Sequence, residues 1–417
     1  MSMVLKNIGS IVGFSSGSYA TNTIYLKDGR ICAESDVQQG DAPRIVDCGG
    51  LTLMPGFVDL HGSLPTVAKD SEAAVRGGFT TVVQTVGAHH APHDISSYLS
   101  TKQQFEHAKC SVVVPGALTC GLEGERLSEM GRMAQAGAQI MSHGASLVQS
   151  TQVLWRTFEY AERLGLRVFV RPGEYPLEQH AVARLSDWSV VHGLPGVIAE
   201  SEEIGVYRVA ALARQSGVSV HLTHLSTKRG VDAVRTVRRE NPLITASTTI
   251  HHIALSQDRL PAYDGNSRFT PPLGTRNDCD ALRAGLREGV LQAVASDHLP
   301  HPPRNKRCEF ETAASGAIGF EFSLPGSLQA LGSVDAAMSA LSLGPRNVLG
   351  LPRPTLALGT SPDMVLVAPN EQWMLTKSNC AASESNSPIL GETLFGRVKM
   401  TWVCGDLAFD ACVNREM

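Results

Sequence analysis

The chain has 417 residues, of which 43% are apolar and 18% are charged, so it can bury a large core and is not predominantly disordered. Its formal net charge is −4 and no basic stripe is visible, which argues against nucleic acid as the main partner. No apolar run approaches the roughly 20 residues of a membrane span, residues 1–9 show no secretory signal, and the nine cysteines are dispersed without a C-x-x-C pair. We therefore expect a cytoplasmic protein with no membrane contact and no disulfide framework.

The two ends of the chain share a β-rich texture. Near the N-terminus, Ile24–Leu26 precedes the hairpin turn signal Asp28-Gly29, and Arg30–Cys32 follows it. Residues 355–417 carry similar short runs, such as 364–367 and 396–403, separated by Pro, Gly and Asn. We predict that residues 1–52 and 353–417 pair in one small β-sandwich module.

The middle of the chain, residues 53–352, alternates between buried strands and amphipathic helices. The predicted strands are 53–61, 80–86, 111–118, 138–143, 167–171, 219–225, 243–249 and 291–297. The predicted helices are 69–77, 126–137, 153–164, 202–216, 229–240 and 278–288. Alternation repeated about eight times is typical of an α/β fold of the (β/α)₈ TIM-barrel type, in which chemistry is placed at the C-terminal ends of the strands.

Imidazoles and a carboxylate gather at these predicted strand ends. In chain order the polar residues there are Asp59, His61, Ser63, Gln84, Ser142, His143, Arg171, His221, His224, Thr248, Thr249, His251, His252, Asp297, His298 and His301. This composition indicates a divalent-metal hydrolase site, where a metal lowers the pKa of bound water to about 7 and an aspartate accepts its proton.

The sequence resembles the dihydroorotase branch of the amidohydrolase superfamily over nearly its whole length. The matching segments are MPGFVDLH (54–61), RGGFTTVV (76–83), GLPGVIAES (193–201), VHLTHLSTK (220–228), TPPLGTRND (270–278), ASDHLPH (295–301) and RNVLGLPRPTLALGTSPDMVLV (346–367). The resemblance implies a (β/α)₈ barrel with a β-module built from both termini, and a place in pyrimidine biosynthesis.

Several positions depart from the family pattern. The resemblance implies H-x-H-x-R after the first strand, where this chain has His61, Ser63 and Pro65. The other replaced positions are Gly87 and Thr270, each in place of a substrate-contacting Asn, Ser142, in place of a metal-bridging carboxylate, and Arg171, in place of a metal-ligating His. Retained are the ligand His224, the catalytic Asp297, which also binds metal, and the substrate-binding His301.

These replacements weaken both the metal site and the substrate site. The two-metal centre implied by the resemblance needs four His and a bridging carboxylate besides the last Asp, whereas His61, His224 and Asp297 alone remain. An always-charged Arg171 would repel a dication, although His143 offers a substitute ligand. Loss of the arginine–carboxylate fork at Pro65 removes about 1.5–3 kcal/mol of substrate binding.

Three interpretations of the function follow. In the first, the chain is a catalytically inactive dihydroorotase-like protein without a cofactor, which forms homo-oligomers and serves as a structural partner of aspartate transcarbamoylase. The alternative is an active zinc-dependent cyclic-amide hydrolase with a reduced site, in which Asp297 carries the proton of the attacking water to the leaving nitrogen. A barrel that binds a small ligand without chemistry is the third interpretation.

Other conspicuous residues are expected to have structural roles. We predict a solvated loop for His89, His90 and His93, packing roles for His251 and His252, and a core position for His221. We expect Arg171 to pair with Glu174 or Asp297, and the loop 378–387 to be mobile.

Overall fold

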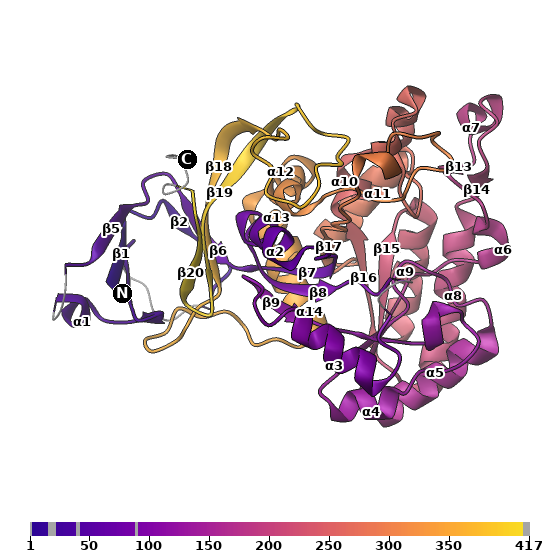
Figure 1. Cartoon of the computed structure of the whole chain (residues 1–417), viewed down its shortest axis with the longest axis horizontal. Coiled ribbons are helices and arrows are strands. Elements are labelled where there is room, and N and C mark those ends of the chain that lie inside the picture. The colour runs from indigo at the N-terminus through magenta and orange to yellow at the C-terminus, as the bar shows by residue number, and fades with distance from the viewer. Residues whose placement is uncertain (1, 16–21, 39–41, 88–90, 412–417) are drawn as a thin grey trace.

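The computed structural model describes residues 2–15, 22–38, 42–87 and 91–411. Its centre is a ring of parallel strands (Figure 1). One sheet holds β7 (Phe57–Gly62), β8 (Phe79–Gln84) and β9 (Ser111–Val113), and the other holds β10 (Gly116–Ala117), β11 (Ile140–Ser142), β12 (Arg167–Val170), β15 (Val220–Leu225), β16 (Ile244–Thr249) and β17 (Ala293–Ala295). A parallel bridge between Gly62 and His298 joins the first position of the ring to the last. This confirms the predicted (β/α)₈ barrel.

One predicted barrel strand is interrupted and another is divided. Pro115 separates β9 from β10, because proline has no N–H to donate to the sheet. The strand expected at 53–61 is two strands that meet at Gly56, where a side chain would collide with Thr80. The first of them, β6 (Thr52–Pro55), pairs with the C-terminal strand β18 and not with the barrel. A domain boundary after residue 52, as expected from the sequence, would therefore divide β6, whereas the whole of this strand pairs with the C-terminal sheet.

Helices surround the barrel. They are α2 (Val67–Arg76), α3 (Ile95–Gln104), α4 (Met130–Gln135), α5 (Thr151–Arg163), α8 (Glu200–Ser216), α9 (Lys228–Glu240), α10 (Ile250–Ala254), α11 (Arg276–Arg287), α12 (Phe320–Leu331), α13 (Val334–Met338) and α14 (Gly344–Leu349). In α9 the residues Val231, Val234 and Val237 are buried, whereas Arg229 and Arg239 are exposed, as an amphipathic helix requires. No helix within the described ranges has the length and apolar content needed to cross a bilayer.

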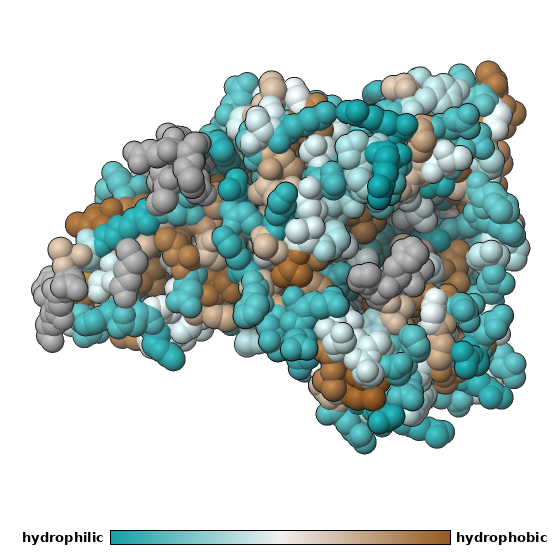
Figure 2. Space-filling model, in the orientation of Figure 1, coloured by the Kyte–Doolittle hydropathy of each residue, from teal (hydrophilic) through white to brown (hydrophobic). Residues whose placement is uncertain are grey.

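An inserted segment with short helices and strands of its own lies between β12 and α8. It contains α6 (Tyr175–Glu178), β13 (Ala183–Arg184), α7 (Asp187–Val191) and β14 (Gly196–Val197). Figure 2 shows a mostly hydrophilic surface with apolar residues at the tip where Figure 1 places α7, and Val190 and Val191 are exposed there.

The two ends of the chain build the predicted β-module beside the barrel (Figure 1). One sheet has the order β4 (Arg30–Ile31), β3 (Ile24–Lys27), β1 (Ser2–Lys6), β5 (Arg44–Asp47), and α1 (Glu34–Gln38) adjoins it. The second sheet has the order β2 (Ser10–Ile11), β6, β18 (Met364–Met374), β19 (Thr393–Val403), β20 (Asp406–Asp410). Leu5, Leu53, Leu366 and Trp402 form a core between segments from both ends.

The loop expected to be mobile is anchored to the barrel. Asp70 Oδ1 accepts a hydrogen bond from Ser383 N at 2.8 Å, and Glu321 Oε2 accepts one from Ala381 N at 3.1 Å. Buried Asn386 accepts from His301 N at 2.9 Å and donates to Leu299 O at 3.0 Å. The C-terminal module therefore holds the segment that follows the last barrel strand.

We predict that Asn386→Ala lowers the free energy of unfolding by about 1–2 kcal/mol, because the backbone N–H of His301 and two carbonyl groups lose their partner. Chemical denaturation measures this loss, and amide hydrogen exchange should quicken at Leu299 and His301. Ser383→Ala is the matched control, since Ser383 uses its backbone N–H for anchoring. Equal stability of the two variants would contradict the anchoring role.

Candidate functional site

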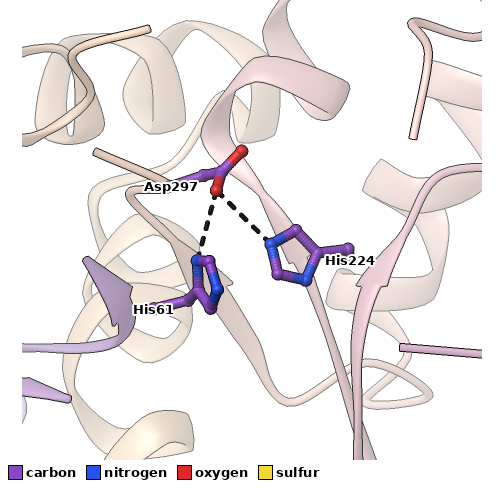
Figure 3. A group of neighbouring side chains, drawn as sticks. All are labelled: His61, His224 and Asp297. Carbon is purple, nitrogen blue, oxygen red and sulfur yellow. Dashed lines mark hydrogen bonds and ion pairs between the residues drawn. The ribbon is translucent and has the colours of Figure 1, made fainter. Parts of the chain in front are cut away.

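Three side chains from three strand ends converge at the mouth of the barrel (Figure 3). His61 comes from β7, His224 from β15, and Asp297 from the segment after β17. Asp297 Oδ1 lies 3.2 Å from His61 Nδ1 and 3.3 Å from His224 Nε2. The two imidazole rings meet edge to face with centroids 4.2 Å apart, and all three side chains are buried.

The protonation of this group follows from its contacts. Burial lowers the pKa of His224 to about 4, so its imidazole is neutral at pH 7. Burial acts to raise the pKa of Asp297, but the hydrogen bond with His224 and the close approach of His61 outweigh it, and the pKa lies below its ordinary value. Asp297 is therefore an ionised carboxylate held between two imidazoles.

Thr85 completes the contacts of His61. Its Oγ1 lies 2.6 Å from His61 Nε2, on the side of the ring away from Asp297. With the threonine hydroxyl donating to Nε2, the imidazole keeps its proton on Nδ1, facing the carboxylate. Thr85 falls within the predicted strand 80–86 and is not among the polar strand-end residues that the sequence singles out.

Both His224 and Asp297 have left-handed backbones, with φ of 58° and 46°. Such a conformation costs roughly 1–2 kcal/mol for a residue with a side chain, and strain of this kind gathers at functional sites. It persists where neighbouring contacts hold the chain, and two buried carboxylates supply those contacts here.

Glu202 fixes the chain after His224. Its carboxylate accepts hydrogen bonds from the backbone N–H and hydroxyl of Ser226 and from the same groups of Thr227, with contacts of 2.6–3.2 Å. Arg184 lies 4.0 Å away and adds positive charge. Glu202 stands in the helix-forming segment 202–216, and nothing in the sequence distinguishes it from a surface glutamate.

Asp59 fixes the chain before Asp297. Its buried carboxylate accepts hydrogen bonds from His61 N at 3.2 Å and from Ser296 N at 2.9 Å, and the Ser296 hydroxyl also donates to it. Burial raises the pKa of Asp59, and these hydrogen bonds oppose that rise. Asp59 thus ties the first barrel strand to the last and sets the spacing between His61 and Asp297.

Arg171 lies near the group but is not paired as expected. Its guanidinium donates to Glu178 Oε2 at 2.5 Å and to Ala145 O at 2.6 Å. The expected pairing with Glu174 or Asp297 is wrong, because the chain turns into α6 after β12 and brings Glu178 over Arg171, while Glu174 pairs with Arg208 at 2.9 Å. Glu178 thereby neutralises the positive charge that was expected to repel a cation.

A cavity of about 740 Å³ opens in front of the group. His61, Thr85 and Asp297 form part of its wall, as do three of the replaced positions, Gly87, Arg171 and Thr270. The other replaced positions, Ser63, Pro65 and Ser142, are not among its lining residues.

The remaining sequence candidates lie apart from the group. His143 is buried with both ring nitrogens unpartnered among the described residues, and it is not one of the three converging ligands. His301 donates from Nε2 to Ser315 O at 2.8 Å and does not line the cavity. His221, as expected, lies in the core, where it contacts Thr245 and Ser247.

The other histidine predictions concern packing and a loop. His252 is buried and contacts Thr249 and Pro271 O, and His251 packs on Phe269 with ring centroids 4.6 Å apart. His93 contacts Ala91 O at 2.9 Å. His89 and His90 lie outside the described residues.

Comparisons with known proteins agree with this geometry. The family model "Dihydro-orotase-like" matches residues 50–230. The dihydroorotase of Geobacter sp. (strain M21) is 31% identical over 429 residues, covering 99% of this chain and 100% of that protein. The chain belongs to the dihydroorotase family. A second family member, from Geotalea daltonii, is 32% identical and spans 87% of this chain and 88% of its own length.

Solved structures share the fold of this dihydroorotase-family chain. The L-hydantoinase of Arthrobacter aurescens superposes with a TM-score of 0.84 at 21% identity, covering 98% of this chain and 96% of that one. A D-hydantoinase superposes with a TM-score of 0.81 at 20% identity, over 98% of this chain and 95% of that one.

The three converging ligands fit one divalent cation. Zinc bonds of 2.0–2.2 Å at tetrahedral angles separate neighbouring ligand atoms by about 3.4 Å, close to the 3.2 and 3.3 Å between Asp297 Oδ1 and the two imidazoles. Through its contact with His61 Nε2, Thr85 would fix the orientation of the His61 ring, whereas His224 Nδ1 is buried and has no hydrogen-bond partner in the described part of the chain. No second group of three such ligands occurs in the described part of the chain, so the two-metal centre implied by the resemblance has no counterpart there.

Proposed function

We propose that this dihydroorotase-family chain takes part in pyrimidine biosynthesis without hydrolysing dihydroorotate, and that it assembles with aspartate transcarbamoylase as a non-catalytic partner. One observation carries the loss of activity: the walls of the barrel-mouth cavity hold an Arg171–Glu178 ion pair, Gly87 and Thr270 where the resemblance implies a metal ligand and substrate contacts.

The state of Asp297 supports the same conclusion. A general base works best when its pKa lies near the working pH, and the two imidazoles hold the pKa of Asp297 below its ordinary value. Both imidazoles also approach the same carboxylate oxygen, Oδ1, and their contacts stabilise the ionised form over the protonated one that a general base must reach.

The partnership rests on the retained architecture. The barrel and the β-module persist while site residues have changed, which is the pattern expected when a protein is kept for its shape. Assembly with aspartate transcarbamoylase, and self-association of this chain, are therefore the properties to test.

Sedimentation velocity of this chain mixed with aspartate transcarbamoylase tests the proposal. We expect a species heavier than either component at micromolar concentration. A separate assay of this chain should show no hydrolysis of dihydroorotate. Runs of this chain alone report its own oligomeric state. Separate sedimentation at all concentrations, with a transcarbamoylase that is stable and active alone, would contradict the partnership.

A second candidate function follows from the three converging ligand atoms. A bound divalent cation would supply Lewis acidity at His61, His224 and Asp297, and the open cavity would admit a cyclic amide. In that case Asp297 would hold a proton for the leaving nitrogen. Its substrate would be one other than dihydroorotate, because Pro65 replaces the carboxylate-binding arginine.

Metal analysis after zinc loading and dialysis separates the two functions. The first predicts substoichiometric zinc and no amide hydrolysis. The second predicts one zinc per chain, and Asp297→Asn should lose both the zinc and the turnover. The control Asp232→Asn, which alters an exposed ion pair with Arg235, should keep both.

A further inference from the structure

Arg268 lies on the wall of the barrel-mouth cavity without an acidic partner. Its Nε is buried and has no hydrogen-bond partner among the described residues, and none of the ion pairs within the described ranges includes it. Burial lowers the pKa of Arg268, and no neighbouring carboxylate opposes that effect. Arg268 as a whole is half-buried, and taking even part of a guanidinium out of water without a counter-charge costs free energy, which a bound anion would restore.

The other charged groups of the cavity do not supply that counter-charge. Glu178 is paired with Arg171, and Asp297 is held between two imidazoles. Glu123 belongs to the wall but is exposed to solvent. The half-buried carboxylate of Glu178 and the buried carboxylate of Asp297 are thus already engaged.

A second cation strengthens the positive potential near Arg268. Lys306 is buried, and its Nζ donates to Gly265 O at 3.0 Å and Ala314 O at 2.5 Å, which are neutral acceptors. Burial lowers the pKa of Lys306 to about 8; the charge of Arg268 contributes to that fall, and the carboxylate of Asp264 opposes it. The combined positive potential of these two cations favours the binding of an anion on the cavity side of Arg268.

We propose that the cavity binds a small organic anion whose carboxylate or phosphate group pairs with the Arg268 guanidinium. The planar fork of an arginine matches two oxygens of either group. A volume of about 740 Å³ is within the usual range for small-molecule sites. The apolar part of such a ligand would lie against Val86, Leu122, Leu147, Val197, Pro272 and Leu299.

This inference goes beyond the proposed function, because neither assembly with a partner nor loss of hydrolysis requires a ligand. It also differs from the family's carboxylate contact, whose position is Pro65 on the loop after β7. Arg268 lies on the connection between β16 and β17 and approaches the cavity from another part of the barrel. The chain would therefore retain a ligand site after losing the residues that the resemblance assigns to substrate.

Isothermal titration calorimetry of the full chain, treated with EDTA, tests this proposal with three probes. Dihydroorotate and dihydrouracil share a ring and differ in the carboxylate, and inorganic phosphate supplies an anion without the ring. We expect dihydroorotate to bind roughly 10- to 100-fold more tightly than dihydrouracil. This ratio corresponds to the contribution of one hydrogen-bonded charged pair, about 1.5–3 kcal/mol. Binding of phosphate alone would assign the site to phosphate ligands.

Two variants and a control locate the binding group. Arg268→Gln should weaken anion binding by roughly 10- to 100-fold, Arg268→Lys should retain part of it, and Arg235→Gln, on the outer face of α9, should leave it unchanged. The proposal would be overturned by equal affinity for dihydroorotate and dihydrouracil or by unchanged binding in Arg268→Gln. It would also be overturned if neither dihydroorotate nor phosphate bound at about 10 mM, a concentration at which even weak binding is detected. The comparison of probes on the unaltered chain decides the question even where a variant fails to fold. These outcomes are independent of any complex with aspartate transcarbamoylase.

Discussion

Glu202→Ala should lower the free energy of unfolding by about 3–5 kcal/mol, the cost of breaking a buried charged network by removing one partner. The substitution leaves the backbone N–H groups and hydroxyls of Ser226 and Thr227 without this acceptor, and it removes the carboxylate that lies 4.0 Å from buried Arg184. Because these residues follow His224 directly, the left-handed turn at His224 should loosen as well.

Denaturant unfolding followed by circular dichroism measures the loss in Glu202→Ala. Glu203→Ala is a matched control on the same helix, because Glu203 is more exposed and pairs with exposed Arg229 at 3.2 Å; we expect a change below about 0.5 kcal/mol there. A loss below about 1 kcal/mol in Glu202→Ala would show that the network contributes no more than ordinary surface contacts.

The protein should lose stability between about pH 4.5 and pH 7 through Glu321. Burial raises the pKa of Glu321 from 4.5 to about 7, with the Ala381 N–H acting in the opposite direction. The folded state therefore favours the protonated acid: the contribution is complete below the ordinary pKa and is lost as the pH rises through the folded one. Partial exposure of this side chain reduces the expected loss to about 2 kcal/mol.

The stability of Glu321→Gln, measured beside the unaltered chain at pH 5 and pH 8, isolates this effect. The glutamine resembles the protonated acid and does not titrate, so the unaltered chain should fall behind the variant by about 2 kcal/mol over that interval. Exposed Glu240→Gln should show no such divergence. A parallel pH dependence in all three proteins would contradict a raised pKa at Glu321.

The barrel could be predicted because its strands are short buried runs with polar ends, and most predicted strands lie within a few residues of the observed ones. Helix α12 was not predicted, because Pro325 and Gly326 interrupt its pattern although tertiary packing keeps it helical. Helix α3 is weakly amphipathic, and its start depends on the Asp94–Ser97 capping box.

At the site, the sequence predicted which residues remain but not how they are held. Strand ends and family motifs lead to His61, His224 and Asp297, and the structure places the three together. The contacts of Thr85, Glu178 and Glu202 could not be predicted, because each joins segments distant along the chain or depends on a turn. The β-module could be predicted because both termini contain short strand-like runs separated by turn residues. The sequence did not show that β6 belongs to this module, because that depends on its pairing with β18.

The rate of dihydroorotate hydrolysis by the zinc-loaded chain, with the bound metal counted in the same sample, tests the central claim most directly. We predict at most one ion per chain and no hydrolysis above the uncatalysed rate, since a single group of three ligands is available in the described structure and the substrate-binding positions are altered. Two tightly held ions per chain, with turnover of about 1–1,000 per second as in ordinary enzymes, would contradict this account.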